Sequence, residues 1–192
     1  MSLVERVDVL VAIILGLALA ELGTSLHRLM RAGKRIRWDW MSPALAFVML
    51  LEVVQFWWLS QSWYANATEL KLLEFLPRLI VLMFIYLLAA AALPDEVPQQ
   101  GLDLRTFYLE SSRYFWTLIV LLTVLIMIVL VPADGAHDYL GELRRHLLLD
   151  LIALAIAIPA IFFRNIRVQQ SAVVALLALT SWVYLASARA FH

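Results

Sequence analysis

The sequence predicts an all-α integral membrane protein, a bundle of about six transmembrane helices in a single domain. The chain is 64% hydrophobic and its mean hydropathy is +0.85. Soluble domains are only about 45–50% apolar, so a soluble core is not expected for this composition. A spanning helix needs about 20 apolar residues, and 192 residues therefore hold six spans with short connections and no separate soluble domain.

Most of the expected spans are apolar runs that stop at a cluster of charges or at a proline. The basic stretch from Arg31 to Arg37 ends the first run, and Pro94 and Pro132 follow the third and fourth. Ser42 and Pro43 are typical N-cap and first-turn residues for the second span. The spans are expected at about residues 7–30, 42–64, 70–93, 105–131, 139–163 and 171–190.

The distribution of Lys and Arg predicts the orientation of the bundle. The short loop from Arg31 to Arg37 carries four basic residues. Because loops rich in Lys and Arg remain in the cytoplasm, we expect this loop on the cytoplasmic side. The protein is then a multi-pass protein of the plasma membrane, the inner membrane in bacteria, with both termini outside the cytoplasm.

Several ionisable residues lie inside the expected spans. A charged side chain at the centre of a membrane helix costs about 3 kcal/mol on insertion scales, so such residues normally face a bundle interior, a partner charge or water. One set lies at similar depth in the first, second and fourth spans, and we expect it to converge into a polar layer. These candidates for an ion or proton path are Glu21, Glu52, Gln55, Glu110 and Arg113.

A second polar layer is expected nearer the outer side. Glu74 and Arg78 are four residues apart in the third span, and His146 and Asp150 are four apart in the fifth. Residues at this spacing share one face of a helix. Arg78 and Asp150 are the expected ion pair, because an unpaired charge at this depth is strongly disfavoured.

Small residues recur at helical spacing on the face of the first span that turns away from Glu21. This pattern lets two membrane helices approach closely. Packing within the same chain is favoured here over a seam between two copies. The residues of this helix-packing face are Ala12, Gly16, Ala20 and Gly23.

Motifs for catalysis or cofactor binding are not found in the sequence. The chain has no cysteine, which excludes disulfides and thiolate metal sites, and it carries no metalloprotease, serine hydrolase or nucleotide-binding motif. Fifteen basic and fifteen acidic residues cancel, so the overall charge does not favour a nucleic-acid partner. We therefore expect no enzyme activity, no catalytic residue, no metal and no cofactor.

Two kinds of function fit this sequence. The first is a small channel or transporter for protons or cations, in which the acidic layer lines a polar path. The second is a non-catalytic accessory or structural subunit of a larger membrane complex. The expected partners are the lipid bilayer and either a second copy of the chain or another membrane protein. A subunit should carry a stripe of small or polar residues on its lipid-facing side, whereas a self-contained pore should carry them only inside.

Overall fold

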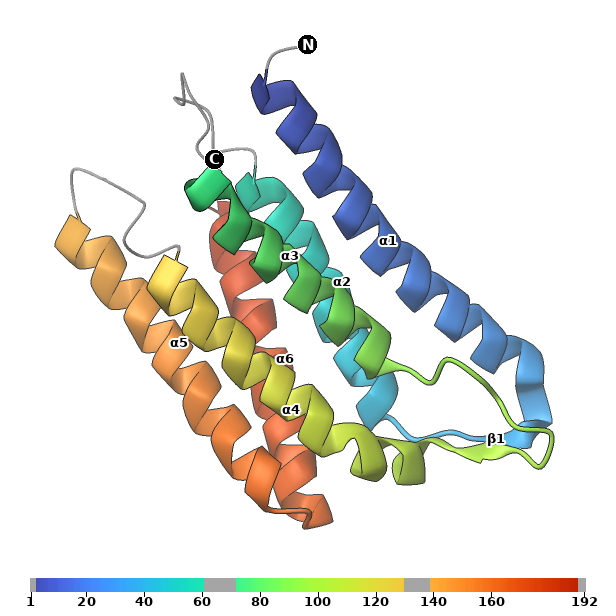
Figure 1. The fold of residues 1–192 in the computed structure, drawn as a ribbon. Coiled ribbons are helices and arrows are strands. Elements are labelled where there is room, and N and C mark those ends of the chain that lie inside the picture. Colours follow the sequence, from blue (N-terminus) through green and yellow to red (C-terminus); the bar gives the residue numbers. More distant parts are fainter. Residues whose placement is uncertain (1–2, 61–71, 130–138, 190–192) are drawn as a thin grey trace.

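The computed structural model of the chain is a bundle of six long helices (Figure 1). It describes residues 3–60, 72–129 and 139–189. The helices are α1 (Leu3–Ala32), α2 (Met41–Ser60), α3 (Leu72–Ala92), α4 (Leu104–Val129), α5 (Tyr139–Phe162) and α6 (Ile166–Arg189). The predicted all-α helical bundle is thereby confirmed.

Five of the described helices are long and apolar enough to cross a membrane, as expected for an integral membrane protein. They correspond to α1, α2, α3, α4 and α6. The predicted span at residues 139–163 is the helix α5, which is 24 residues long and whose described side chains include an apolar stretch from Leu147 to Phe162.

The helices pack so that α1 and α5 lie at opposite edges of the bundle (Figure 1). α1 packs on α2 and α3, and α5 packs on α4 and α6. In the middle, α3 contacts α4 and α2 contacts α6. The core contains Trp116 and Phe115, whose rings pack edge to face with their centroids 5.8 Å apart. Such an arrangement suits the quadrupoles of two aromatic rings.

Most of the basic residues lie at one end of the bundle, where α1 ends, α4 begins and α5 joins α6 (Figure 1). A short 3₁₀ turn, η1 (Gly33–Arg35), leads there into strand β1 (Ile36–Arg37), which pairs in parallel with strand β2 (Leu102–Asp103). We call this the basic end. Its basic residues are Arg28, Arg31, Lys34, Arg35, Arg37, Arg105, Arg164 and Arg167.

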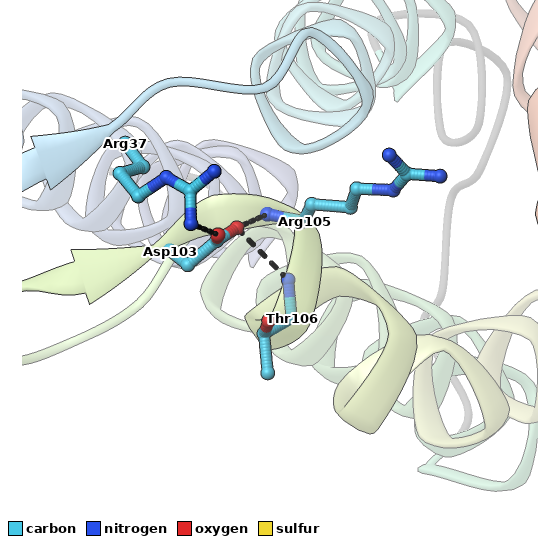
Figure 2. A network of polar contacts seen from close by, with 4 residues as sticks. All are labelled: Arg37, Asp103, Arg105 and Thr106. Carbon is cyan, nitrogen blue, oxygen red and sulfur yellow. Dashed lines mark hydrogen bonds and ion pairs between the residues drawn. The ribbon is translucent and has the colours of Figure 1, made fainter.

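Side-chain caps begin the helices that start at the basic end. Asp103 Oδ1 accepts hydrogen bonds from the N–H groups of Arg105 and Thr106, at 2.9 and 3.3 Å, and the second oxygen of Asp103 lies 3.2 Å from Arg37 Nη1 (Figure 2). These bonds satisfy N–H groups that have no partner inside the first turn of α4. They also tie β1 to the start of α4.

Two predicted boundaries change for the same reason. Asp39 Oδ1 accepts the N–H of Met41 at 3.0 Å, so α2 begins one residue early and the prediction that Ser42 is its N-cap is wrong. Asn165 Oδ1 accepts the N–H of Arg167 at 3.0 Å, so α6 begins at Ile166 instead of residue 171. A hydropathy pattern does not detect such caps, because the capping residue is polar and lies outside the apolar run.

Candidate functional site

Glu52 lies in the middle of α2 and is bonded to a residue of a second helix. Its Oε1 accepts a hydrogen bond of 3.1 Å from Thr180 Oγ1 on α6. Thr180 is buried, at 3% exposure, and α2 and α6 pack against each other along this contact. The pair therefore joins two spans at mid-depth, with the carboxyl group inside the protein.

Gln55 lies one turn further along α2 from Glu52, on the same side of the helix. Its Oε1 is buried and accepts no hydrogen bond among the described residues. A buried carbonyl oxygen without a donor costs about 1–3 kcal/mol, which makes this a polar position that packing alone does not explain. Glu52, Gln55 and Thr180 form the candidate site at the α2–α6 contact, which we call the Glu52 site.

Glu21 makes its contact within its own helix. Ser25 Oγ, one turn along α1, donates a hydrogen bond of 3.3 Å to Glu21 Oε1. The Glu21 side chain is half-buried, and α1 packs on α2 and α3. Nothing here brings Glu21 to the Glu52 site.

Glu110 and Arg113 are exposed on α4, about one turn apart. In the described part of the chain, no hydrogen bond or ion pair joins Glu21, Glu52, Glu110 and Arg113 to one another. No contact among the described residues therefore supports the expectation that these residues converge into one layer. The position of a residue along its helix does not determine which way its side chain points around the helix axis.

The structure describes the side chains of only two of the four residues of the expected outer layer. Arg78 on α3 and Asp150 on α5 are both half-buried, and each has an interaction partner. Glu74 and His146 stand on the same two helices, but their side chains lie outside the described part of the structure. The ion pair between Arg78 and Asp150 stays a prediction.

The small-residue face of α1 was expected to pack within the chain, and the structure shows that it does not. Ala12, Gly16, Ala20 and Gly23 are all exposed. A Cβ atom added at Gly16 or Gly23 would meet no other atom within 4 Å. The helix contacts α2 and α3 through its other side, where Val11, Leu15 and Ala18 are buried. The small residues are left facing outward.

Sequence analysis missed the most completely buried polar cluster, which links α4, α5 and α6. Gln169 Oε1 accepts hydrogen bonds from Tyr108 Oη at 2.7 Å and Trp116 Nε1 at 3.0 Å. Its Nε2 donates to the backbone oxygens of Ala160 and Phe163, at 2.7 and 2.8 Å, near the end of α5. The amide oxygen of Gln169 accepts two hydrogen bonds and its nitrogen donates two, all with protein groups. The cluster therefore holds α4, α5 and α6 together.

One signal for this cluster was present in the sequence. Gln169 and Gln170 precede the apolar run of the last span, and the predicted start at residue 171 excluded both. Gln169 is fully buried, whereas Gln170 is only half-buried. Two adjacent glutamines cannot be told apart until the helix phase is known.

Within the described residues, no group of three or more His, Asp or Glu side chains is placed to hold a metal ion. No family model matches the chain, and neither a curated protein nor a solved structure matches it. The arguments on function therefore rest on the Glu52 site and on the outer face of α1.

Proposed function

We propose that this chain is a non-catalytic subunit of a membrane assembly, and that it packs against another transmembrane helix through the small-residue face of α1. The exposure of Gly16 and Gly23, with open space where a side chain would be, carries this proposal. Between membrane helices, small residues allow backbones to approach closely and gain van der Waals contact. Lipid chains, as apolar as leucine, gain nothing comparable from such a groove.

A polar side chain next to this face favours a protein partner over lipid. Thr24 follows Gly23 and is exposed within the span Val7–Arg35. A polar side chain facing hydrocarbon is unfavourable, and a neighbouring helix lowers that cost by excluding lipid and supplying hydrogen-bond partners. A self-contained pore would keep such residues inside the bundle.

The proposal includes a placement in the cell. The excess of Lys and Arg at the basic end favours a cytoplasmic position for this end in the plasma membrane, with α1 beginning and α6 ending on the opposite side. The partner is a second copy of the chain or another membrane protein. Either one presents a helix to the same face of α1.

Disulfide cross-linking in native membranes tests this proposal cleanly, because the chain has no cysteine of its own. Single cysteines are introduced as Gly16→Cys and Ala20→Cys. Ala155→Cys is the matched control, since Ala155 is exposed on α5 at the opposite edge. Oxidation should give a cross-linked species from both α1 variants and little from the control.

The size of the cross-linked species identifies the partner. A product at twice the 21.9 kDa mass of the chain indicates a second copy. A product of another size, specific to the α1 positions and identified by mass spectrometry, indicates a different subunit. Cross-linking no stronger than at Ala155, together with a monomer in mild detergent, would refute the subunit proposal.

The Glu52 site supports a second candidate, a proton or cation path. A carboxyl group held between two spans by the Thr180 hydroxyl, beside a buried Gln55 oxygen, offers acceptor groups in the interior of the bundle. Intramembrane acids in such positions are characteristic of proton relays and ion sites. In this candidate the path follows the α2–α6 contact and excludes Glu110 and Arg113, which face outward.

Flux into liposomes tests the path. Glu52→Gln removes the ionisable group but keeps the shape and the Thr180 partner, so it should abolish proton or potassium flux with folding intact. Glu110→Gln makes the same chemical change at an exposed position and should leave flux unchanged. Absence of flux in the parent protein, or equal effects of the two variants, would eliminate this candidate.

A further inference from the structure

A pocket of about 610 Å³ lies at the basic end, between the last turns of α1 and the connection from α3 to β2. Its charged lining consists of Arg28, Arg31, Arg35, Asp95 and Glu96. The three arginines come from successive turns of α1 and η1, so their side chains gather on one side of the chain. We call it the arginine pocket.

The arginines of the pocket keep side-chain donors that are not bonded to described protein groups. Arg28 Nη1 donates to the backbone oxygen of Asp95 at 2.6 Å and so holds the connection against α1. Arg31 and Arg35 are exposed and, in the part of the chain that the structure describes, make no side-chain hydrogen bond or ion pair. Two guanidinium groups thus have their donors available at the pocket.

The backbone around the pocket is fixed by a close contact. Gly101 has a φ of +96°, and a Cβ atom at this position would lie 2.7 Å from the backbone oxygen of Arg35. Only glycine fits this approach, which sets the α3–α4 connection directly against η1. Together with the pairing of β1 and β2, this contact builds the pocket before any ligand enters.

The pocket lies at the boundary between apolar and polar surface. The first span ends at Arg35, and Leu26 and Met30 are exposed on α1 within the last turns before the pocket. Trp38 and Trp40, at 52% and 42% exposure, follow directly. Exposed tryptophans of this kind are typical of the membrane interface, where lipid headgroups lie.

From this geometry we infer that the arginine pocket binds the phosphate group of an anionic phospholipid headgroup. Guanidinium groups bind phosphate oxygens in a bidentate manner, and the available Arg31 and Arg35 supply two such groups. The carboxylates of Asp95 and Glu96 limit the net charge of the lining to one positive charge against three arginines. This balance suits a single phosphodiester, as in phosphatidylglycerol, more than a headgroup with several phosphates.

Native mass spectrometry of the purified full chain measures the binding, with dioleoylphosphatidylglycerol and dioleoylphosphatidylcholine as probes with identical acyl chains. The parent should bind phosphatidylglycerol about tenfold more tightly than phosphatidylcholine, and Arg31→Gln with Arg35→Gln should remove that preference. Arg105→Gln with Arg167→Gln is the matched control. It removes the same charge from the basic end outside the pocket and should preserve the preference.

A second pair of variants tests the pocket without changing any charge. Gly101→Ala forces the connection away from Arg35 and should weaken phosphatidylglycerol binding severalfold. Gly33→Ala is its control, since Gly33 also has a positive φ, +54°, but open space around the added atom. Binding should then be unchanged.

Inorganic phosphate distinguishes the two sources of the phosphate group. Lipid-free protein that binds phosphate alone, and loses it in the Arg31 and Arg35 variant, assigns the pocket to a soluble phosphate compound. Binding of phosphatidylglycerol only assigns it to a headgroup. Equal loss in the pocket variant and in the Arg105 and Arg167 control, or no preference for phosphatidylglycerol in the parent, would overturn the inference.

Discussion

The two edges of the bundle differ in the burial and hydrogen bonding of their polar residues. At the α4–α5–α6 edge, Gln169 is fully buried and its amide is engaged by Tyr108, Trp116 and two backbone oxygens. At the α1 edge, Gly16, Gly23 and Thr24 face outward, and Glu21 finds only Ser25 of its own helix. The Gln169 amide therefore finds all its partners within the chain, whereas the small residues of α1 lie on its exposed side.

Under the subunit proposal, this difference separates residues that stabilise the fold from residues that serve association. A buried polar group in a membrane helix is tolerated when every donor and acceptor has a partner. In the proposed assembly, the small groups on the outer side of α1 meet a helix of another molecule. We therefore expect changes at the Gln169 cluster to alter stability, and changes on the α1 face to alter assembly.

The largest effect is expected at Gln169. Gln169→Ala leaves Tyr108 Oη without its acceptor, Trp116 Nε1 with only its longer bond to Tyr108, and two carbonyl oxygens at the end of α5 without a donor, and should lower the free energy of unfolding by about 3 kcal/mol. Denaturation in mixed micelles, followed by tryptophan fluorescence, measures it. Gln170→Ala, next to it and half-buried, is the control and should change stability by less than about 0.5 kcal/mol. Equal losses of stability in the two variants would show that the Gln169 cluster does not hold the three helices together.

An intermediate effect is expected on α1, from two alanines on opposite faces. Ala18 is fully buried, so Ala18→Leu should overpack the core and cost about 2 kcal/mol in the monomer. Ala20 is exposed, so Ala20→Leu should leave the monomer within about 0.5 kcal/mol of the parent and weaken association instead. Unfolding in monomeric micelles and size-exclusion mass measurement in mild detergent give the two quantities. A stability loss at Ala20 as large as at Ala18 would contradict the outward orientation of this face.

The smallest effect is expected at the basic end. Asp103→Ala removes two bonds to the first turn of α4 and should cost about 1 kcal/mol. Arg37→Gln removes only an ion pair whose arginine is 86% exposed, and should cost less than about 0.5 kcal/mol. Thermal unfolding compares the two variants. If Arg37→Gln proves the more damaging, the ion pair and not the cap holds the start of α4.

The amino-acid sequence by itself determined the class of the protein and the approximate extent of its helices. Apolar runs of spanning length predict the helices because a backbone in lipid must satisfy its hydrogen bonds internally, and this requirement depends on local composition. All six helices lie where the runs predict them. Errors of several residues, as at the start of α6, arise where capping by Asn165 extends a helix into a polar segment.

Only the tertiary structure decided which polar residues meet. Depth along each helix is a linear property that can be counted, and it led to the prediction that Glu21, Glu52 and Glu110 share one level. The rotation of each helix about its axis depends on how large apolar side chains pack against neighbouring helices, which no single segment contains. That packing turned Glu52 toward Thr180, left Glu110 outside, buried Gln169 but not Gln170, and faced the glycines of α1 outward.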